Sequence, residues 1–299
     1  MSFSPSLDDL LDHRDLILVT GKGGTGKSTV VAALAGLAAR RRGRAIAAEL
    51  SVHPRLPEMV DPAGAVTTVN IDPEEVVGDV LGRLLHLPTL VSALLKNRII
   101  RLFIRTSPAI REMVALEELR HLVDRSSSEG YPVVVDLPAS GHALSFLDTP
   151  RAVHRLLRVG PLAEVAERIE TMLLDPRRSE VVVVALPEEL PINETIELFH
   201  RAAASGLASR TVLVNQVPEE PMQAEDRALL ELVGRHRDHA LGRLAGAAQS
   251  EMEDVLQARA QIERLRRSVA AEVIELPRMI SPDLRSCVRA VLASLGAGA

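Results

Sequence analysis

The chain has 299 residues, of which 46% are hydrophobic but only 2% aromatic, and its formal net charge is −5. This length suits one large α/β domain or two small ones, with a core that must be mainly aliphatic. The acidic balance argues against a dominant nucleic-acid surface, so we expect no nucleic-acid partner. The single cysteine, Cys287, excludes an intrachain disulfide and any Cys-x-x-Cys metal site.

The N-terminal segment does not have the pattern of a signal peptide. Residues 1–16 carry four acids and no apolar core. No uninterrupted apolar run approaches the ~18 residues of a transmembrane helix. We therefore expect a soluble, cytoplasmic protein without a transmembrane segment.

A glycine-rich loop follows the first predicted strand, Leu16–Val19, and precedes a helical stretch, Val30–Ala39. Its sequence GKGGTGKST fits the phosphate-binding pattern G-x-x-x-x-G-K-[ST] at every fixed position, in the strand–loop–helix context that this pattern requires. The sequence therefore predicts a nucleoside triphosphate site formed by Gly21, Lys22, Gly23, Gly24, Thr25, Gly26, Lys27, Ser28 and Thr29.

The residue types of this loop suit phosphate chemistry. Glycines let the backbone turn tightly and direct its N–H groups at phosphate oxygens, and the start of the next helix adds its positive dipole end. We expect Lys27 to pair with the β- and γ-phosphates of ATP and the Ser28 hydroxyl to bind Mg²⁺. The chain has three lysines against 32 arginines, and two of the three lie in this loop, where a compact ammonium must reach a phosphate.

Short apolar runs alternate with helical segments along the rest of the chain. Strands are predicted over Ala45–Glu49, Val66–Ile71, Val133–Asp136, Val181–Val184, Val212–Val214 and from Val273. Helical patterns cover 74–125 and 218–268, the latter with breaks near Gly234, Gly242 and Gly246; a final helix is capped by Ser281, with Pro282 at its first position.

This alternation predicts an α/β fold with a doubly wound, mainly parallel sheet and ligands at the carboxyl ends of the strands. We expect a single P-loop domain over residues 13–299, with a small helical insert formed by segments 74–128 and 150–175.

Asp136 ends the fourth predicted strand, where a carboxylate can orient Mg²⁺ through water. The segment DLPASGHAL from Asp136 to Leu144, followed by Leu147 and Pro150, resembles the switch D-T-A-P-T-G-H-T-L-x-x-L-x-x-P of the ArsA-like ATPases. This family includes the arsenite-efflux ATPase and the ATPase that delivers tail-anchored membrane proteins. The loop K-G-G-x-G-K-S, which starts at Lys22, also resembles the deviant phosphate loop of this group.

Two further blocks are similar to the family pattern, Leu173–Thr195 and Val212–Gln216, so that the resemblance covers most of residues 13–220. It implies a homodimer, or a heterodimer with a paralogous ATPase, in which Lys22 reaches the nucleotide of the partner subunit. It also implies that Gly141 approaches the γ-phosphate. The residues that it places at the adenine are Asn215, Gln216, Pro277 and Arg278.

The chain departs from the family in its first switch. ArsA-like chains follow the second strand with D-P-A-H, whose aspartate positions the attacking water; here Ser51 occupies roughly that place and Glu49 lies two residues earlier. Loss of such a carboxylate typically costs ~10²–10⁴-fold in rate. Hydrolysis is therefore slow or uses Glu49, or a partner hydrolyses the ATP. The catalytic candidates are Lys22, Lys27, Glu49 and Asp136, and the magnesium ligands are Ser28 and Asp136.

Three functions stay open. The first is a Mg²⁺-ATP-dependent dimeric switch ATPase that controls a protein client on the helical segment 74–125, although its leucine stripe also suits a core or a dimer interface. The second is a hydrolysis-poor regulatory subunit paired with an active paralogue. The third is a ParA/MinD-like positioning ATPase, but the apolar stripe from Leu284 to Leu295 has few charges and is predicted to be the last helix of the fold rather than a membrane-binding one.

Overall fold

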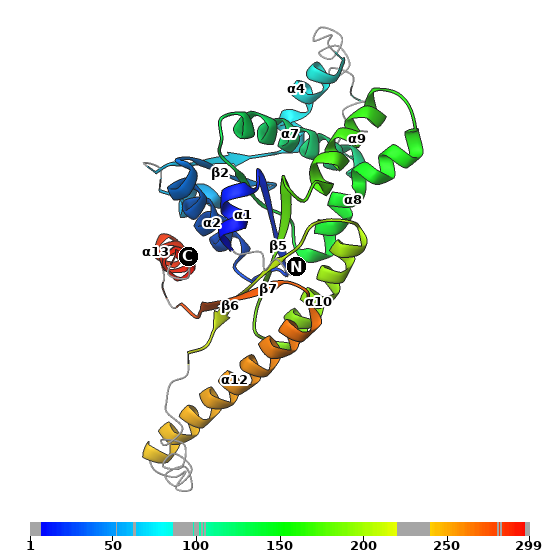
Figure 1. Ribbon diagram of the computed structural model, residues 1–299. Coiled ribbons are helices and arrows are strands. Elements are labelled where there is room, and N and C mark those ends of the chain that lie inside the picture. Colours follow the sequence, from blue (N-terminus) through cyan, green and yellow to red (C-terminus); the bar gives the residue numbers. More distant parts are fainter. Residues whose placement is uncertain are drawn as a thin grey trace.

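The computed structural model describes residues 7–51, 53–61, 64–85, 98, 102, 104, 106–219, 240–279, 281 and 283–296. Within these residues, seven strands form one sheet in the order β3-β2-β4-β1-β5-β6-β7 (Figure 1), and every paired neighbour is parallel. The predicted α/β fold with a parallel sheet is confirmed. The strands are β1 (Leu16–Gly21), β2 (Ala45–Glu49), β3 (Val66–Asn70), β4 (Val133–Asp136), β5 (Ser179–Ala185), β6 (Thr211–Val217) and β7 (Glu272–Pro277).

The central strands are apolar on both sides because helices cover both faces of the sheet. Successive side chains of a strand point to opposite faces, and β1 shows this directly. Ile17 and Val19 belong to one buried cluster, whereas Leu16 and Leu18 belong to the other. The sheet thus has two cores, one on each face.

One face is covered by α1 (Leu7–His13), α2 (Lys27–Arg42), α3 (Leu56–Met59) and α13 (Leu284–Gly296). The predicted last helix is confirmed: α13 packs on α2, with Val288, Val291 and Leu295 buried. Leu7, Leu10 and Leu11 of α1 are buried in the same cluster as α2. Helix α1, which precedes most of the predicted domain, therefore packs on the same core as α2.

The opposite face is covered by α7 (Pro108–Ser128), α8 (Ser140–Leu157), α9 (Pro161–Leu174), α10 (Glu189–Ala204) and α12 (Ala240–Ser268). Beyond the sheet, α4 (Pro73–Leu85) packs on α7 through a small cluster that includes Val77, Val80 and Val114. Helices α4, α7, α8 and α9 gather at one end of the molecule, and α12 extends away from the other (Figure 1). Much of the predicted segment between α4 and α7 lies outside the described residues.

Two details of the predicted helices are wrong. Helix α12 runs unbroken through Gly242 and Gly246, because a glycine weakens a helix interior without ending it. Gly234, the third predicted break, lies outside the described residues. Helix α13 begins at Leu284, and its cap is Asp283 rather than Ser281. The Asp283 carboxylate accepts hydrogen bonds from the backbone N–H of Ser286 at 2.9 Å and from its hydroxyl at 2.6 Å.

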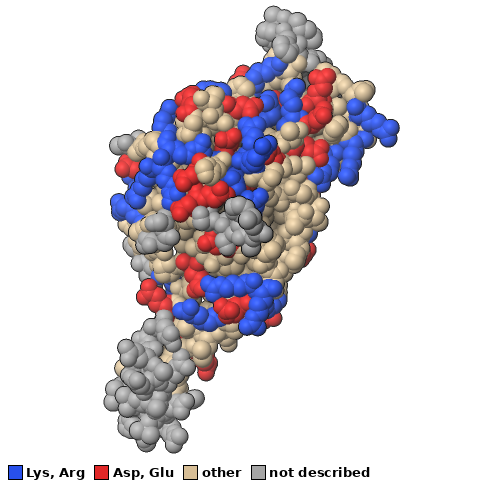
Figure 2. All heavy atoms as spheres, in the orientation of Figure 1, with Lys and Arg blue, Asp and Glu red and all other residues tan. Residues whose placement is uncertain are grey.

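Among the described helices, none has a stretch that is both sufficiently long and sufficiently apolar to span a bilayer. On the face shown in Figure 2, basic and acidic side chains are interspersed.

Candidate nucleotide site

The phosphate-binding loop joins β1 to α2 at the carboxyl edge of the sheet. Gly24 and Gly26 have φ angles of 86° and 88°, a left-handed conformation that glycine adopts readily. A Cβ atom at Gly26 would also collide with the side-chain amide of Asn215. Cβ atoms added at Gly23 and Gly24 would meet no atom within 4 Å, so the outer side of the loop is open to a ligand.

Asn215, at the end of β6, braces this loop from the side. Its carboxamide nitrogen donates a hydrogen bond to the backbone carbonyl of Thr25 at 2.8 Å. The Thr25 hydroxyl in turn donates to the carbonyl of Lys22 at 2.9 Å. Both Asn215 and Thr25 are buried. The amide that the family resemblance assigns to adenine is therefore engaged with the phosphate loop, a role that the sequence did not reveal.

Lys27, Ser28 and Asp136 meet where the loop faces β4. The Ser28 hydroxyl donates to the Asp136 carboxylate at 2.5 Å, and the Lys27 ammonium donates to the carbonyl of Lys22 at 3.2 Å. Burial raises the pKa of Asp136, against the opposing effects of the Ser28 hydrogen bond and the nearby Lys27 charge. Burial lowers the pKa of Lys27, and here the charge of Asp136 opposes the shift.

These shifts mean that burial disfavours the charged form of each group. An anionic phosphate beside Lys27 and a divalent cation beside Asp136 would both favour the charged forms, so the side chains fit Mg²⁺-ATP. No group of three or more acids, histidines or cysteines that could hold a metal occurs among the described residues. Mg²⁺ usually keeps several water ligands and is bound through one or two carboxylates together with substrate phosphates.

Lys22 points to the surface of its own chain. Its ammonium pairs with the Glu194 carboxylate on α10 at 2.9 Å, and both side chains are more than 40% exposed. Because exposed ion pairs contribute only about 0–1 kcal/mol, this contact can exchange for a better one at small cost. The sequence did not single out Glu194 as the partner of Lys22.

Glu49 ends β2 and is buried. Its two carboxylate oxygens accept the backbone N–H groups of Arg55 at 2.9 Å and Leu56 at 3.1 Å, so Glu49 holds the start of α3. Such hydrogen bonds to helix-start N–H groups stabilise the segment after β2. In this conformation both oxygens are engaged, and the geometry favours a positioning role over that of a base.

Ser51 lies in the turn that follows β2. Its hydroxyl accepts the backbone N–H of His53 and also contacts the His53 carbonyl, each at 3.1 Å. Ser51 also lines a cavity of about 210 Å³ together with Pro138, after β4, and Arg111 and Glu112 of α7. This cavity lies between the two predicted switch segments, which follow β2 and β4, and helix α7 of the helical insert.

Gly141 lies in the first turn of α8, and a Cβ atom added there would meet open space.

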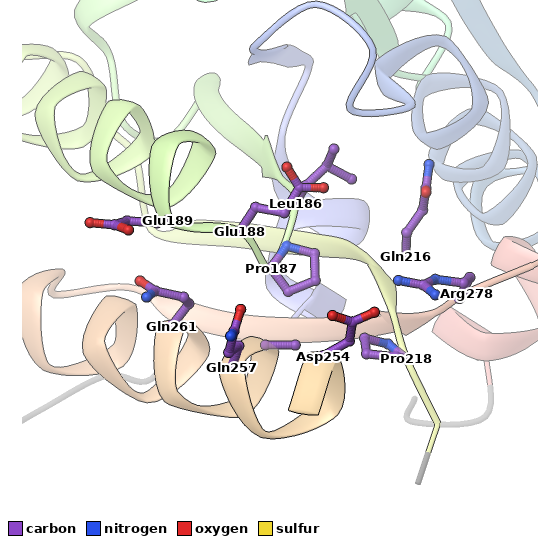
Figure 3. A pocket seen from close by; sticks show the side chains of 11 residues that line it. Leu186, Pro187, Glu188, Glu189, Gln216, Pro218, Asp254, Gln257, Gln261 and Arg278 are labelled. Atoms are coloured by element: carbon purple, nitrogen blue, oxygen red, sulfur yellow. The ribbon is translucent and has the colours of Figure 1, made fainter. Parts of the chain in front are cut away.

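The other residues that the family resemblance places at the adenine, Gln216, Pro277 and Arg278, lie on the other side of β1. A pocket of about 490 Å³ opens at the ends of β5, β6 and β7 (Figure 3), and Gln216 and Arg278 line it, whereas Pro277 does not. The other lining residues are Leu186, Pro187, Glu188, Glu189, Pro218, Asp254, Gln257, Ala258 and Gln261.

The fold and this site define a P-loop nucleotide-binding protein. The family model described as anion-transporting ATPase matches residues 158–231. The ATPase BagA of Mycobacterium tuberculosis is 32% identical over 232 residues, which cover 71% of this chain and 68% of the relative. The chain therefore belongs to the ArsA-like family and is an ATPase.

More distant relatives agree with this assignment. The ATPase GET3 of Chaetomium globosum is 24% identical over 264 residues, or 72% of this chain and 77% of the relative. The arsenical pump-driving ATPase of Escherichia coli is 28% identical over 212 residues, or 65% of this chain and 34% of the relative.

The contacts of Glu49 generate a test of its role. Glu49→Gln replaces one acceptor oxygen by an amide donor that would face a backbone N–H, so the free energy of unfolding should fall by about 1–3 kcal/mol. Chemical denaturation measures this change, and Glu58→Gln, an exposed position on α3, is the control. Loss of turnover with unchanged stability and unchanged ATP binding would instead identify Glu49 as the base.

Proposed function

We propose that this protein is a Mg²⁺-ATP-dependent dimeric switch ATPase whose nucleotide state controls a client surface on its helical insert. The observation that supports this most strongly is the meeting of Lys27, Ser28 and Asp136 beside an open glycine loop. ATP and Mg²⁺ are the cofactors. We further propose a cytoplasmic location and no nucleic-acid partner, in line with the interspersed charges in Figure 2.

The roles of the loop residues follow from their positions. Backbone N–H groups of the loop and the start of α2 bind the phosphates, and Lys27 neutralises charge on the β- and γ-phosphates. The Ser28 hydroxyl oxygen would bind Mg²⁺ through a lone pair, which leaves its hydrogen free to keep donating to Asp136, and the Asp136 carboxylate would orient water around the ion. Gly141 leaves room for the γ-phosphate beside the second switch.

The exposed Lys22 supports the dimer. Within one chain the lysine is held by Glu194 at the surface, where a second subunit can reach it. In the dimer Lys22 leaves Glu194 and contacts the nucleotide of the partner. The second subunit is an identical chain or a paralogous ATPase.

Hydrolysis by this chain is slow in our proposal. Ser51 has no carboxylate to orient the attacking water, and Glu49 already accepts two backbone hydrogen bonds. The same observation favours the second candidate function, a regulatory subunit that binds ATP beside an active paralogue. The positioning-ATPase alternative has less support, because the apolar side of α13 packs on α2.

The client surface is an apolar cavity of about 380 Å³ between α4, α7, α8 and α9. Aliphatic side chains line it, with Glu117 as the single acid among the described lining residues. Leu156, a lining residue in the last turn of α8, is 81% exposed, and Val159, in the connection from α8 to α9, is 83% exposed. We propose an apolar helical segment of a protein as the occupant, since an exposed aliphatic patch that continues into a cavity suits apolar burial.

Nucleotide binding should require Lys27. At an ATP concentration of about 100 times Kd, binding adds about 2.7 kcal/mol to the apparent stability of the wild type. Lys27→Ala should abolish the corresponding shift in melting temperature in Mg²⁺-ATP, whereas Arg40→Ala, at an exposed position of the same helix, should retain it. An unchanged shift in Lys27→Ala would disprove the assignment of this loop.

Lys22 should act between subunits. Lys22→Ala should keep ATP affinity within about tenfold, or roughly 1.4 kcal/mol, yet lose ATP-dependent dimerisation or turnover. Binding is measured by calorimetry and dimerisation by analytical ultracentrifugation. Glu194→Gln, which removes the intrachain pair but keeps the lysine, should retain dimerisation. Wild-type behaviour of Lys22→Ala would make this residue an ordinary surface lysine.

Ser51→Asp should restore a water-orienting carboxylate. We expect kcat to rise by at least about tenfold, a part of the ~10²–10⁴-fold that such a group contributes. Ser51→Ala, which removes the hydroxyl without adding a carboxylate, is the matched control in a steady-state ATPase assay. Wild-type turnover already at ~1–10 s⁻¹ would contradict the proposal of slow hydrolysis.

A further inference from the structure

The pocket at the ends of β5, β6 and β7 differs in chemistry from the phosphate loop. Three acids line it, Glu188, Glu189 and Asp254, against one base among the described lining residues, Arg278. Carboxylates repel phosphate oxygens but accept hydrogen bonds from N–H and O–H groups. The pocket therefore suits an uncharged part of a ligand that carries hydrogen-bond donors.

The sheet order places this pocket on the nucleoside side of the site. Strand β4, which carries Asp136, pairs with one edge of β1, and β5 pairs with the other, followed by β6 and β7. Ser28 and Asp136, which are hydrogen-bonded to each other, would hold the metal and the terminal phosphate on the β4 side. A nucleotide bound to the loop then extends its sugar and base toward β5–β7, into a space of about 490 Å³.

Helix α12 forms one wall of the pocket. Its lining residues, Asp254, Gln257, Ala258 and Gln261, are spaced i, i+3, i+4 and i+7, which places them on one face of the helix. The side chains of Asp254, Gln257 and Gln261 project from α12 toward the pocket in Figure 3. Ala258 has a small side chain, so the wall is recessed at Ala258, and the longer polar side chains stand on either side of this recess.

The opposite wall contains a strained residue. Gln216 has a φ angle of 59°, a conformation that residues other than glycine rarely adopt, and it lies at a β-bulge between β6 and β7. Bulges and left-handed residues of this kind are concentrated at ligand sites. Asn215, one residue earlier, has its amide engaged with the phosphate loop. The edge of the base is therefore contacted by other side chains of the pocket.

We propose that α12 reads the base of the nucleotide, with the Asp254 carboxylate accepting a hydrogen bond from the exocyclic amine of adenine. The Gln257 amide donates to the adjacent ring nitrogen N1, so that the two residues match one donor and one acceptor on the edge of the base. This inference rests on the proposed nucleotide function, and it makes α12 the specificity element of the site.

The test combines a change in the ligand with a change in the protein. Binding of ATP and of purine riboside triphosphate, which lacks the amine, is measured by calorimetry for wild type, Asp254→Ala and Glu253→Ala. Glu253 is an exposed carboxylate next to Asp254 on α12 and is not among the pocket residues. A hydrogen bond to a charged group corresponds to roughly tenfold or more in affinity, so wild type and Glu253→Ala should prefer ATP by about that factor.

Asp254→Ala should bind the two nucleotides with nearly equal affinity, while its circular dichroism spectrum stays that of the wild type. Gln257→Ala should weaken both nucleotides, because both keep N1. If Asp254→Ala retains the wild-type preference, or if the wild type has none, the assignment to α12 is wrong. Lys27-dependent ATP binding would then still support the proposed function.

GTP provides the remaining comparison, because guanine offers a carboxylate two donors, N1–H and its 2-amine, in place of the adenine amine. Weaker binding of GTP than of ATP by the wild type supports the adenine assignment. Tighter binding of GTP that depends on Asp254 would overturn it.

Discussion

The hydrogen bond between Ser28 and Asp136 is the contact on which the site depends. It joins the first turn of α2 to the end of β4, two segments 108 residues apart in the chain, at 2.5 Å. Because β4 pairs directly with β1, the sheet places the carboxylate opposite the loop that holds Lys27. Burial disfavours the charged forms of both Asp136 and Lys27, so a bound cation and a bound phosphate would each favour the charged form of the group beside it.

The same sheet order divides the carboxyl edge into two halves with different chemistry. On the β4 side lie Asp136, Ser28 and the two switch segments. On the β5 side lie Asn215, the strained Gln216 and the pocket whose lining includes three acids and one face of α12. Strand β1 separates the halves, and its loop contacts both. A ligand with a charged end and an uncharged end fits this division.

A path connects the phosphate side to the helical insert. The cavity lined by Ser51, Pro138 and Arg111 touches the segments after β2 and β4 and the beginning of α7. Arg111 also pairs with Glu74 of α4 at 3.5 Å, and Glu112 is hydrogen-bonded to Thr149 of α8. The walls of the apolar cavity are thus tied to the residues around the nucleotide, which gives the proposed control of a client a physical route.

The fold class, the phosphate loop and the family could all be predicted from the amino-acid sequence. Alternating strands and helices, a motif of fixed spacing and a second motif after Asp136 are local patterns, so no tertiary knowledge was needed to find them. Predictions that depended on one residue, the helix breaks at Gly242 and Gly246 and the cap at Ser281, were wrong, because a glycine weakens a helix without ending it and because the neighbouring Asp283 provides the cap. The tertiary structure alone decided which side chains meet across the chain: Lys22 with Glu194, Asn215 with Thr25, Glu49 with the start of α3, and α12 with the ends of β5–β7. Such partners depend on the order of the strands in the sheet and on the faces against which the helices pack. Neither the strand order nor the packing faces can be deduced from the spacing of residues in the sequence.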